Sequence, residues 1–308
     1  MEEVLDITDV SQLPDTGAAS EIVDTTPVQT ESVDTESTKI LPTPKSIEEL
    51  KVALVIITIG QQRWQYEKLF IPSIKAYATK WNYDFFQIKD MLDHTLQPKP
   101  NDTYMKQTIC MQKCLIAQQS WAQKYDIIIY MDSDFLINID SAPNIIQEYQ
   151  LGKIAAVDER TMFGNSAYVS SVWQRVAPHL PKTAEEYYSK FFPGQESFDK
   201  QFNGGLIVFQ PNVHAEFFKM VYDKYMPYIL SGKDIDGDQA VLNFEANKAN
   251  LVQYLDERWN RLWNFCWVLY YGFLNEKEHR DILRLCLKQI FDTHYCIHFA
   301  GGCGWSLL

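Results

Sequence analysis

Two carboxylates stand one residue apart at the end of an apolar run. Asp132 and Asp134 flank Ser133 in the stretch MDSDFLI, directly after the apolar residues 127–131. Residues two apart on a strand point to the same face, so both carboxylates are expected to face one ligand if the strand continues. Two anions this close destabilise each other unless a cation or a shared proton lies between them. The spacing therefore favours a hard divalent cation, Mg²⁺ or Mn²⁺, bound together with substrate phosphates.

The acidic residues allow two other interpretations. The first is an acidic turn that caps a following helix, but apolar residues on both sides of MDSDFLI favour a buried strand. The second is an EF-hand, because DIDGDQAVLNFE places acids at loop positions 1, 3, 5 and 12, namely Asp234, Asp236, Asp238 and Glu245. Gln239 stands where that loop needs glycine, and the segment after it has a helical pattern. A loop that leads into a helix N-terminus is therefore favoured.

Two further stretches contain residue types that occur at ligand sites. In FNGGLIVFQP, Gly204 and Gly205 permit positive φ or the close approach of a ligand, although a tight turn would use them equally well. In HFAGG, His298 lies between apolar residues, where a histidine bonded within the core is the commoner case. With a divalent site predicted elsewhere, His298 becomes a candidate third ligand.

The elements that must position these residues alternate between strand and helix patterns. Strands are expected at residues 52–60, 83–90, 126–137, 153–159, 202–211, 251–260 and 295–305. Helices are expected at residues 65–81, 103–125, 212–230 with Asn212 as N-cap, 237–248 and 276–291, and irregular loops at 161–173 and 191–201. This alternation predicts an α/β fold with a Rossmann-like, mostly parallel central sheet flanked by helices. Ligands bind at the carboxyl ends of such strands, where Asp132 and Asp134 stand.

Charge divides the chain into two parts. Of a net charge of −12, residues 1–45 carry −8, with ten acids against two lysines, so the remainder carries −4. We predict a disordered acidic tail at residues 1–45, either an inert extension or a docking or phosphorylated segment, and a single domain at residues 46–308. The mildly acidic domain argues against nucleic-acid binding.

The spacing of the six cysteines and the length of the apolar runs indicate in which compartment the protein is expected. No C-x-x-C pair is present, which argues against a structural zinc site, and a chain this large does not need disulfides. No secretory leader pattern and no apolar run of 18 residues is found. We therefore expect a soluble, cytoplasmic protein without a transmembrane segment.

Six motifs, taken in order, resemble those of nucleotide-sugar glycosyltransferases of the GT-A fold: MDSDFLI, KIAAVDE, FNGGLIVFQP, DGDQAVLNF, LDERWN and HFAGG. The resemblance covers about residues 50–308. It is closest to the retaining family 8, which is glycogenin- and galactosyltransferase-like, with some similarity to family 34 in HFAGG. It implies a single GT-A domain and Mn²⁺- or Mg²⁺-dependent transfer from a nucleotide-sugar donor, with UDP-sugar favoured. The implied acceptor is a hydroxyl on a glycan or protein, and the implied stereochemistry is retention.

The resemblance also implies roles for individual residues. Asp132, Asp134 and His298 would be the metal ligands, and Asp238 and Gln239 would be the catalytic residues beneath the anomeric carbon. The implied donor-binding residues are Thr58, Ile59, Gly60, Arg63, Lys113, Asp132, Ser133, Asp158, Asn203, Gly204, Gly205 and Gly301. The candidate residues for the pocket wall are Ser166, Tyr168, Phe202 and Trp263. The candidates for aromatic stacking, which could equally be core residues, are Trp173, Tyr187, Tyr188 and Trp259.

One departure from the family pattern affects the diphosphate. Family 8 members commonly continue their His-Phe-x-Gly motif into Lys-Pro-Trp, whereas residues 302–305 here are GCGW. We therefore expect Arg63 or Lys113 to neutralise the diphosphate together with the cation.

Two other functions share part of this pattern. A haloacid-dehalogenase-type phosphatase also uses D-x-D after a strand, but it needs Thr or Val where Leu136 stands, near the start of its domain. A catalytically degenerate nucleotide-sugar-binding or scaffold module is the other alternative, and the complete set of acids with His298 argues against it.

Overall fold

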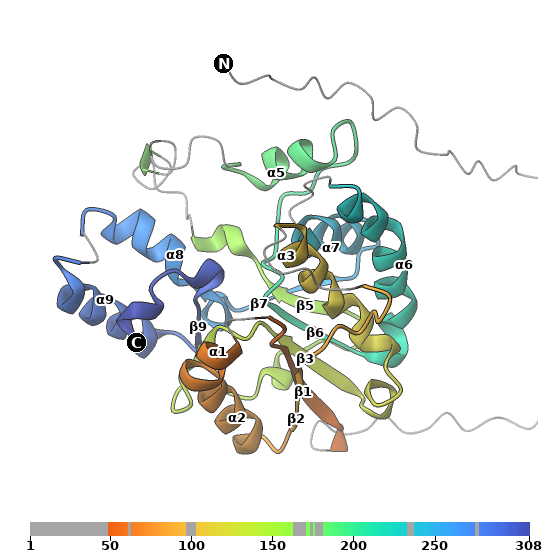
Figure 1. Cartoon of the computed structure of the whole chain (residues 1–308), viewed down its shortest axis with the longest axis horizontal. Coiled ribbons are helices and arrows are strands. Elements are labelled where there is room, and N and C mark those ends of the chain that lie inside the picture. The colour runs from red at the N-terminus through yellow and green to blue at the C-terminus, as the bar shows by residue number, and fades with distance from the viewer. Residues whose placement is uncertain are drawn as a thin grey trace, which may run out of the picture. The chain divides into compact units, whose positions relative to one another are not determined.

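The computed structural model (Figure 1) describes residues 49–308 apart from 61–62, 97–102, 163–170, 173–174, 176–180, 233–236 and 275–276. The predicted acidic tail, most of the predicted loop at 161–173, and Asp234 and Asp236 lie outside the described residues. Residues 45–308 form one compact unit. The predicted boundary between residues 45 and 46 stays a prediction.

A six-stranded sheet forms the centre of the fold, in the order β2-β1-β3-β6-β5-β7. Its strands are β1 (Val52–Ile57), β2 (Asp84–Ile88), β3 (Ile127–Met131), β5 (Ile154–Val157), β6 (Leu206–Phe209) and β7 (Val252–Leu255). Strands β1, β2 and β3 pair in parallel, as do β5 and β7, whereas β6 runs antiparallel to both of its neighbours. The predicted α/β class with a mostly parallel central sheet is confirmed, and the reversed β6 was not predicted.

Helices cover both faces of this sheet, as Figure 1 shows. On one face lie α3 (Thr103–Met111), α6 (Pro211–Leu230) and α7 (Gly237–Lys248), whose apolar side chains pack with alternate residues of the strands. On the other face α2 (Ile71–Lys80) packs on the remaining strand residues. Because β1 and β3 are buried along their whole length, they appear in the sequence as continuous apolar runs rather than alternating ones.

A second, three-stranded sheet stands beside the first, in the order β4-β9-β8. It consists of β4 (Phe135–Ile137), β9 (Cys296–His298) and β8 (Arg261–Leu262). A separate apolar cluster joins this sheet to α8 (Trp263–Cys266) and α9 (Arg280–Thr293), which Figure 1 shows in blue. The predicted strand at 126–137 is therefore wrong as a single element: its two halves, β3 and β4, belong to different sheets.

Several predicted helices begin or break at other residues. The helix expected at 65–81 is two helices, α1 (Arg63–Leu69) and α2, because Pro72 lacks the N–H that would continue the first. Asn212 is not an N-cap, since α6 begins with Pro211, a residue that suits the first helical position, and Gln210 precedes it. Helix α7 matches its predicted range.

Some elements were missed or assigned to the wrong class. The helix expected at 103–125 passes after Met111 into the 3₁₀ segments η2 (Gln112–Gln118) and η3 (Ala122–Lys124). Helices α5 (Ala184–Phe191) and α8, and the π-helical turn η7 (Trp267–Tyr271), were not predicted. No helix among the described ranges is long and apolar enough to cross a membrane.

Candidate active site

The two acidic residues of MDSDFLI lie in a turn between the sheets. β3 ends at Met131, Ser133 and Asp134 form a turn, and β4 begins at Phe135. The backbone N–H of Asp132 donates to the carbonyl of Gly205 at 2.7 Å, which continues the pairing with β6 by one residue. The strand therefore does not continue through Asp132 and Asp134. The expectation that the two carboxylates share one face of an extended strand is not met.

His298 nevertheless joins both carboxylates. Its Nε2 lies 3.2 Å from Asp134 Oδ1 and 3.7 Å from Asp132 Oδ2, and one ligand atom of each residue lies within 4.8 Å of the others. The position of His298 follows from strand pairing, because it lies opposite Phe135 in the β4–β9 register and stacks on that ring with centroids 4.4 Å apart. Two carboxylate oxygens and an imidazole nitrogen form a donor set suited to Mn²⁺, so the residues fit a divalent cation.

A buried lysine lies beside this cluster. Lys113 Nζ is 2.7 Å from Asp238 Oδ2 and 3.6 Å from Asp132 Oδ1, and it donates to the Gly204 carbonyl at 2.8 Å. Burial alone lowers the pKa of the Lys113 ammonium, but the two carboxylates outweigh burial and raise that pKa above its usual value. Burial raises the pKa of Asp132, but Lys113 and His298 outweigh burial and bring that pKa below its usual value. The hydroxyl of Tyr130, which donates a hydrogen bond to the carboxylate, lowers the pKa further. The lysine therefore remains a fixed positive charge beside the candidate metal ligands.

The paired glycines are required by what packs against them. A Cβ on Gly205 would lie 2.4 Å from Cε1 of His298, and a Cβ on Gly204 would lie 2.7 Å from Oδ2 of Asp238. Both distances are too short for any real side chain. The two glycines therefore let the backbone just before β6 approach the imidazole and the Lys113–Asp238 pair, which a tight turn alone would not require.

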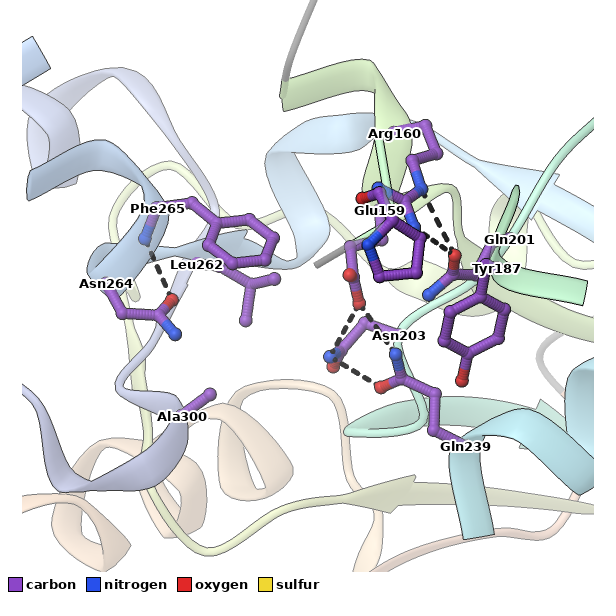
Figure 2. A pocket seen from close by; sticks show the side chains of 11 residues that line it. Glu159, Arg160, Tyr187, Gln201, Asn203, Gln239, Leu262, Asn264, Phe265 and Ala300 are labelled. Atoms are coloured by element: carbon purple, nitrogen blue, oxygen red, sulfur yellow. Dashed lines mark hydrogen bonds between the residues drawn. The ribbon is translucent and has the colours of Figure 1, made fainter. Parts of the chain in front are cut away.

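Next to the glycines, two side-chain amides and one carboxylate form a closed triangle. Oε2 of Glu159 accepts from Gln239 Nε2 at 2.9 Å and from Asn203 Nδ2 at 3.2 Å, and Asn203 Nδ2 also donates to Gln239 Oε1 at 3.0 Å. Figure 2 shows the Glu159 carboxylate pointing toward both amides. Burial raises the pKa of Glu159, and Arg160 and the two amides offset only part of this effect.

A cavity of about 230 Å³ opens beside this triangle (Figure 2). Polar groups from Glu159, Gln201, Asn203, Gln239 and Asn264 line it together with the rings of Tyr187 and Phe265. The remaining lining residues are Arg160, Pro181, Leu262 and Ala300. Amides, a carboxylate and aromatic rings in one cavity can hydrogen-bond the hydroxyls and contact the C–H faces of a small polar ligand.

Several of the predicted donor-binding residues make their contacts away from Lys113 and the cluster of Asp132, Asp134 and His298. Thr58 is buried after β1 and bonds the carbonyl of Ile88, and Arg63 forms an ion pair with Glu67 on α1. Asp158 accepts from the backbone N–H of Arg160, so it caps the turn that carries Glu159 toward the cavity. Ser133 is buried in the turn between the sheets, Ile59 is partly buried, and Gly60 and Gly301 are exposed with positive φ.

The candidate residues for the pocket wall and for aromatic stacking lie in different surroundings. Tyr187 lines the cavity, whereas Phe202, Trp263 and Trp259 are buried in the apolar clusters. Tyr188 is buried too, with its hydroxyl donating to the carbonyl of Lys200. Ser166, Tyr168 and Trp173 lie outside the described residues.

Sequence reasoning missed most of the residues that line the cavity, as well as Tyr130 and Asn260 beside it. Glu159 and Arg160 directly follow Asp158 in VDER. Glu159 had a weak signal, because it is an acid next to the predicted donor-binding residue Asp158. Tyr130 gave no signal, because a tyrosine inside a strand is common in any core. Asn260 ends the motif LDERWN, but nothing in the sequence distinguishes it from the other residues of that motif.

No protein-family model and no curated protein matches the chain. Solved structures of glycosyltransferases do match it. It is similar to a glycosyltransferase involved in the glycosylation of the major capsid of PBCV-1, with 11% identity and a TM-score of 0.46, over 81% of this chain and 93% of that one. A second match is the galactosyltransferase LgtC in complex with donor and acceptor sugar analogs, with 12% identity and a TM-score of 0.46, over 81% and 87% of the two chains.

A third match is mouse xyloside xylosyltransferase 1, with 13% identity and a TM-score of 0.40, over 82% of this chain and 99% of that one. The likeness in fold to glycosyltransferases that the motifs predicted is therefore found among solved structures. At these TM-scores it lends no weight to any function, which rests on the side chains of the site.

Proposed function

We propose that this chain is a metal-dependent glycosyltransferase that moves a sugar from a nucleotide-diphosphate donor, a UDP-sugar, to a hydroxyl on a glycan or protein. The observation that carries the proposal is the cluster of Asp132, Asp134 and His298 at the end of β3, with the Lys113 cation beside it. An amide-lined cavity lies near this cluster, where a sugar attached to a metal-bound diphosphate would need polar partners.

The proposed metal site consists of Asp132, Asp134 and His298. When bound, Mn²⁺ or Mg²⁺ supplies a Lewis acid for the negative charge that develops on the departing diphosphate. Lys113 adds a fixed positive charge next to the same position and needs no rearrangement to do so, because Asp238 and the Gly204 carbonyl already hold it in place.

The amide triangle is proposed to hold the sugar. Asn203 and Gln239 present polar groups to the cavity in orientations fixed by Glu159, so hydroxyls of the sugar can bond to them without reorganising the site. Asp238 and Gln239 lie on the first turn of α7, and we assign them to stabilising the cationic sugar during front-face attack. That assignment entails retention of the anomeric configuration.

The test is donor hydrolysis with and without Mn²⁺ over a panel of UDP- and GDP-sugars. We expect Mn²⁺-dependent release of UDP that Asp132→Ala and Asp134→Ala each reduce at least about 100-fold, since each removes a proposed ligand. Unchanged turnover in either variant contradicts the metal assignment. Calorimetric binding of UDP without turnover over any acceptor would instead favour a nucleotide-sugar-binding module, and release of phosphate from a phosphomonoester would favour a phosphatase.

A further inference from the structure

A buried asparagine connects the amide triangle to the proposed metal ligand. Asn260, which is 1% exposed, donates from Nδ2 to Asn203 Oδ1 at 3.0 Å. Its own Oδ1 lies 3.1 Å from Nδ1 of His298. The side chains of Glu159, Asn203, Asn260 and His298 therefore form a continuous chain of hydrogen bonds that ends at the imidazole. The far side of that ring, Nε2, faces the carboxylates of MDSDFLI.

A backbone group fixes the direction of this chain of bonds. The N–H of Gly205 can only donate, and it lies 3.0 Å from the side chain of Asn203, so the atom that faces it is the carbonyl oxygen Oδ1. The NH₂ group of Asn203 then faces Glu159, whose carboxylate oxygen accepts from it, which is consistent with the same orientation. The orientation of the Asn203 amide therefore follows from its partners and does not depend on telling its oxygen from its nitrogen.

The same logic continues to the imidazole. Because Asn203 Oδ1 is an acceptor, the atom of Asn260 that faces it is the NH₂ group, and the carbonyl oxygen of Asn260 faces His298. An acceptor at this position requires a proton on Nδ1 of the neutral ring. The lone pair of Nε2 then points toward Asp134 and Asp132, where it would repel both carboxylates unless a cation lies between them.

We propose that Asn260 is a positioning residue that holds His298 in the Nδ1–H tautomer, with Nε2 ready to bind a divalent cation. The inference rests on the metal site of the proposed function, but not on glycosyl transfer. An outer partner of this kind sets both the tautomer and the orientation of a histidine ligand, and its loss typically weakens metal binding 10–100-fold. The stacking of the ring on Phe135 and its contact with Gly205 limit its orientation but carry no information about the proton.

The test measures the tautomer and the metal affinity separately. Long-range ¹H–¹⁵N spectra of protein with labelled histidine, with just enough Mg²⁺ to saturate the wild type, are expected to show His298 as Nδ1–H, because this diamagnetic cation removes the repulsion between Nε2 and the two carboxylates. The His298→Gln spectrum assigns the signal. In Asn260→Leu we expect the Nε2–H tautomer to appear and the Kd for Mn²⁺, measured from free Mn²⁺ by electron paramagnetic resonance, to rise roughly 10–100-fold. An unchanged tautomer and an unchanged Kd in this variant would overturn the proposal.

Asn138→Leu is the matched control. Asn138 is another buried asparagine, next to β4, and its side chain bonds the carbonyl of Phe291 and the backbone N–H of Ser141 instead of His298. We expect its variant to keep both the tautomer and the Kd, and an equal loss in both variants would show a general effect of removing a buried amide. If Asn260→Leu does not fold, Asn260→Asp takes its place. That substitution keeps an acceptor toward Nδ1, so a switch to Nε2–H in this variant overturns the proposal and retained Nδ1–H supports it.

The outcomes also separate this inference from the proposed function. If the wild-type chain binds Mn²⁺ and Asn260→Leu binds it equally well, only the role of Asn260 fails. If the wild-type chain binds Mn²⁺ but turns over no sugar donor, only the glycosyltransferase proposal fails. If the wild-type chain does not bind Mn²⁺ at all, both fail.

Discussion

Lys113 is a buried cation shared between two carboxylates. Its side chain is 4% exposed, and its partner Asp238 is almost equally buried. Removing one member of such a pair leaves the other charge in the interior without compensation, which costs far more than the net contribution of the intact pair. The lysine is therefore a stability determinant whether or not the proposed chemistry is correct.

We expect Lys113→Met to lower the free energy of unfolding by about 3–5 kcal/mol, because Asp238 and Asp132 lose their counter-ion. Urea denaturation followed by fluorescence measures this. Lys219→Met is the matched control, because Lys219 forms an exposed ion pair with Asp223 one helical turn away, and about 0.5 kcal/mol or less is expected. Equal losses in the two variants would refute the assignment of a buried ion pair.

Glu159 should make stability fall as pH rises. Burial raises the pKa of this carboxyl above its ordinary 4.5, so the folded state binds more protons than the unfolded state over the interval between the two values. Stability contributed by Glu159 is therefore present at low pH and lost as pH rises through the folded pKa. Glu159→Gln, which cannot ionise, should gain stability relative to the wild type from about pH 4.5 upward, as measured by denaturant midpoints across pH.

Glu67→Gln is the control, because its effect on stability as pH rises is expected to have the opposite sign to that of Glu159→Gln. Arg63 lowers the pKa of the Glu67 carboxyl by hydrogen bonding, so the charged form is favoured in the folded state. That variant should lose stability relative to the wild type above about pH 4.5. If both variants show the same slope, a general charge effect and not the burial of Glu159 is responsible.

The predictability of the site differs from residue to residue. Asp132, Asp134 and His298 lie together, as the resemblance implied, because the strand ends that carry them meet. Glu159 was missed because the local turn decides which acid of VDER points inward: Asp158 uses its carboxylate to cap the turn, and Glu159 reaches Asn203. Sequence spacing does not reveal such a choice between neighbours.

At the scale of elements, α7 carries Asp238 and Gln239 on its first turn. The helix begins at Gly237, whose φ is +60°, a conformation that L side chains rarely adopt. The position of this first helical turn determines how Asp238 faces Lys113 and how Gln239 faces Asn203. The start of this helix therefore couples backbone conformation to the proposed chemistry.

We expect Gly237→Ala to cost about 1–2 kcal/mol of stability and also to lower Mn²⁺-dependent donor turnover, because the first turn of α7 shifts to relieve the strain. Gly194→Ala is the control: its φ is +76° and its surroundings are open, so a similar stability loss with unchanged turnover is expected. Thermal unfolding and donor hydrolysis measure the two effects. Unchanged turnover in Gly237→Ala would show that donor turnover does not depend on the conformation at the start of α7.

Element existence was largely predictable, and element continuity was not. The apolar runs of β1 and β3 and the helical pattern of α7 identified those elements. The continuation of 126–137 into a second sheet was not visible, because residues 127–131 and 135–137 are equally apolar on either side of the turn. Their separate partners, β6 and β9, are what distinguish β3 from β4, and these pairings are not local.

At the scale of the whole molecule, the α/β class and the mostly parallel sheet followed from alternation alone. The direction of β6 did not follow, since an apolar strand of four residues reads the same in a parallel or an antiparallel sheet. The small second sheet was missed for a similar reason: β8 has only two residues, too few for any periodic pattern.

The compact unit at residues 45–308 should fold without the rest of the chain. We predict that a chain of residues 46–308 has the same midpoint of thermal unfolding and the same donor turnover as the full chain, because the apolar clusters and the site lie within the compact unit. Calorimetry and the hydrolysis assay check both. A fall of about 3 °C or more, equal to roughly 1 kcal/mol in a domain of this size, would show that residues 1–45 contribute to the fold.

The strand order carries a consequence for how the chain acquires its site during synthesis. Asp132 and Asp134 are made early, whereas His298 belongs to β9, which pairs with β4 across more than half of the sequence. A growing polypeptide therefore has the main sheet's first three strands and both carboxylates long before it has the imidazole, and the loop that must close between them is long. A cation captured at the proposed site by the nascent chain would be held by oxygens alone, and the three-residue site would be complete only after β9 has emerged from the ribosome and docked.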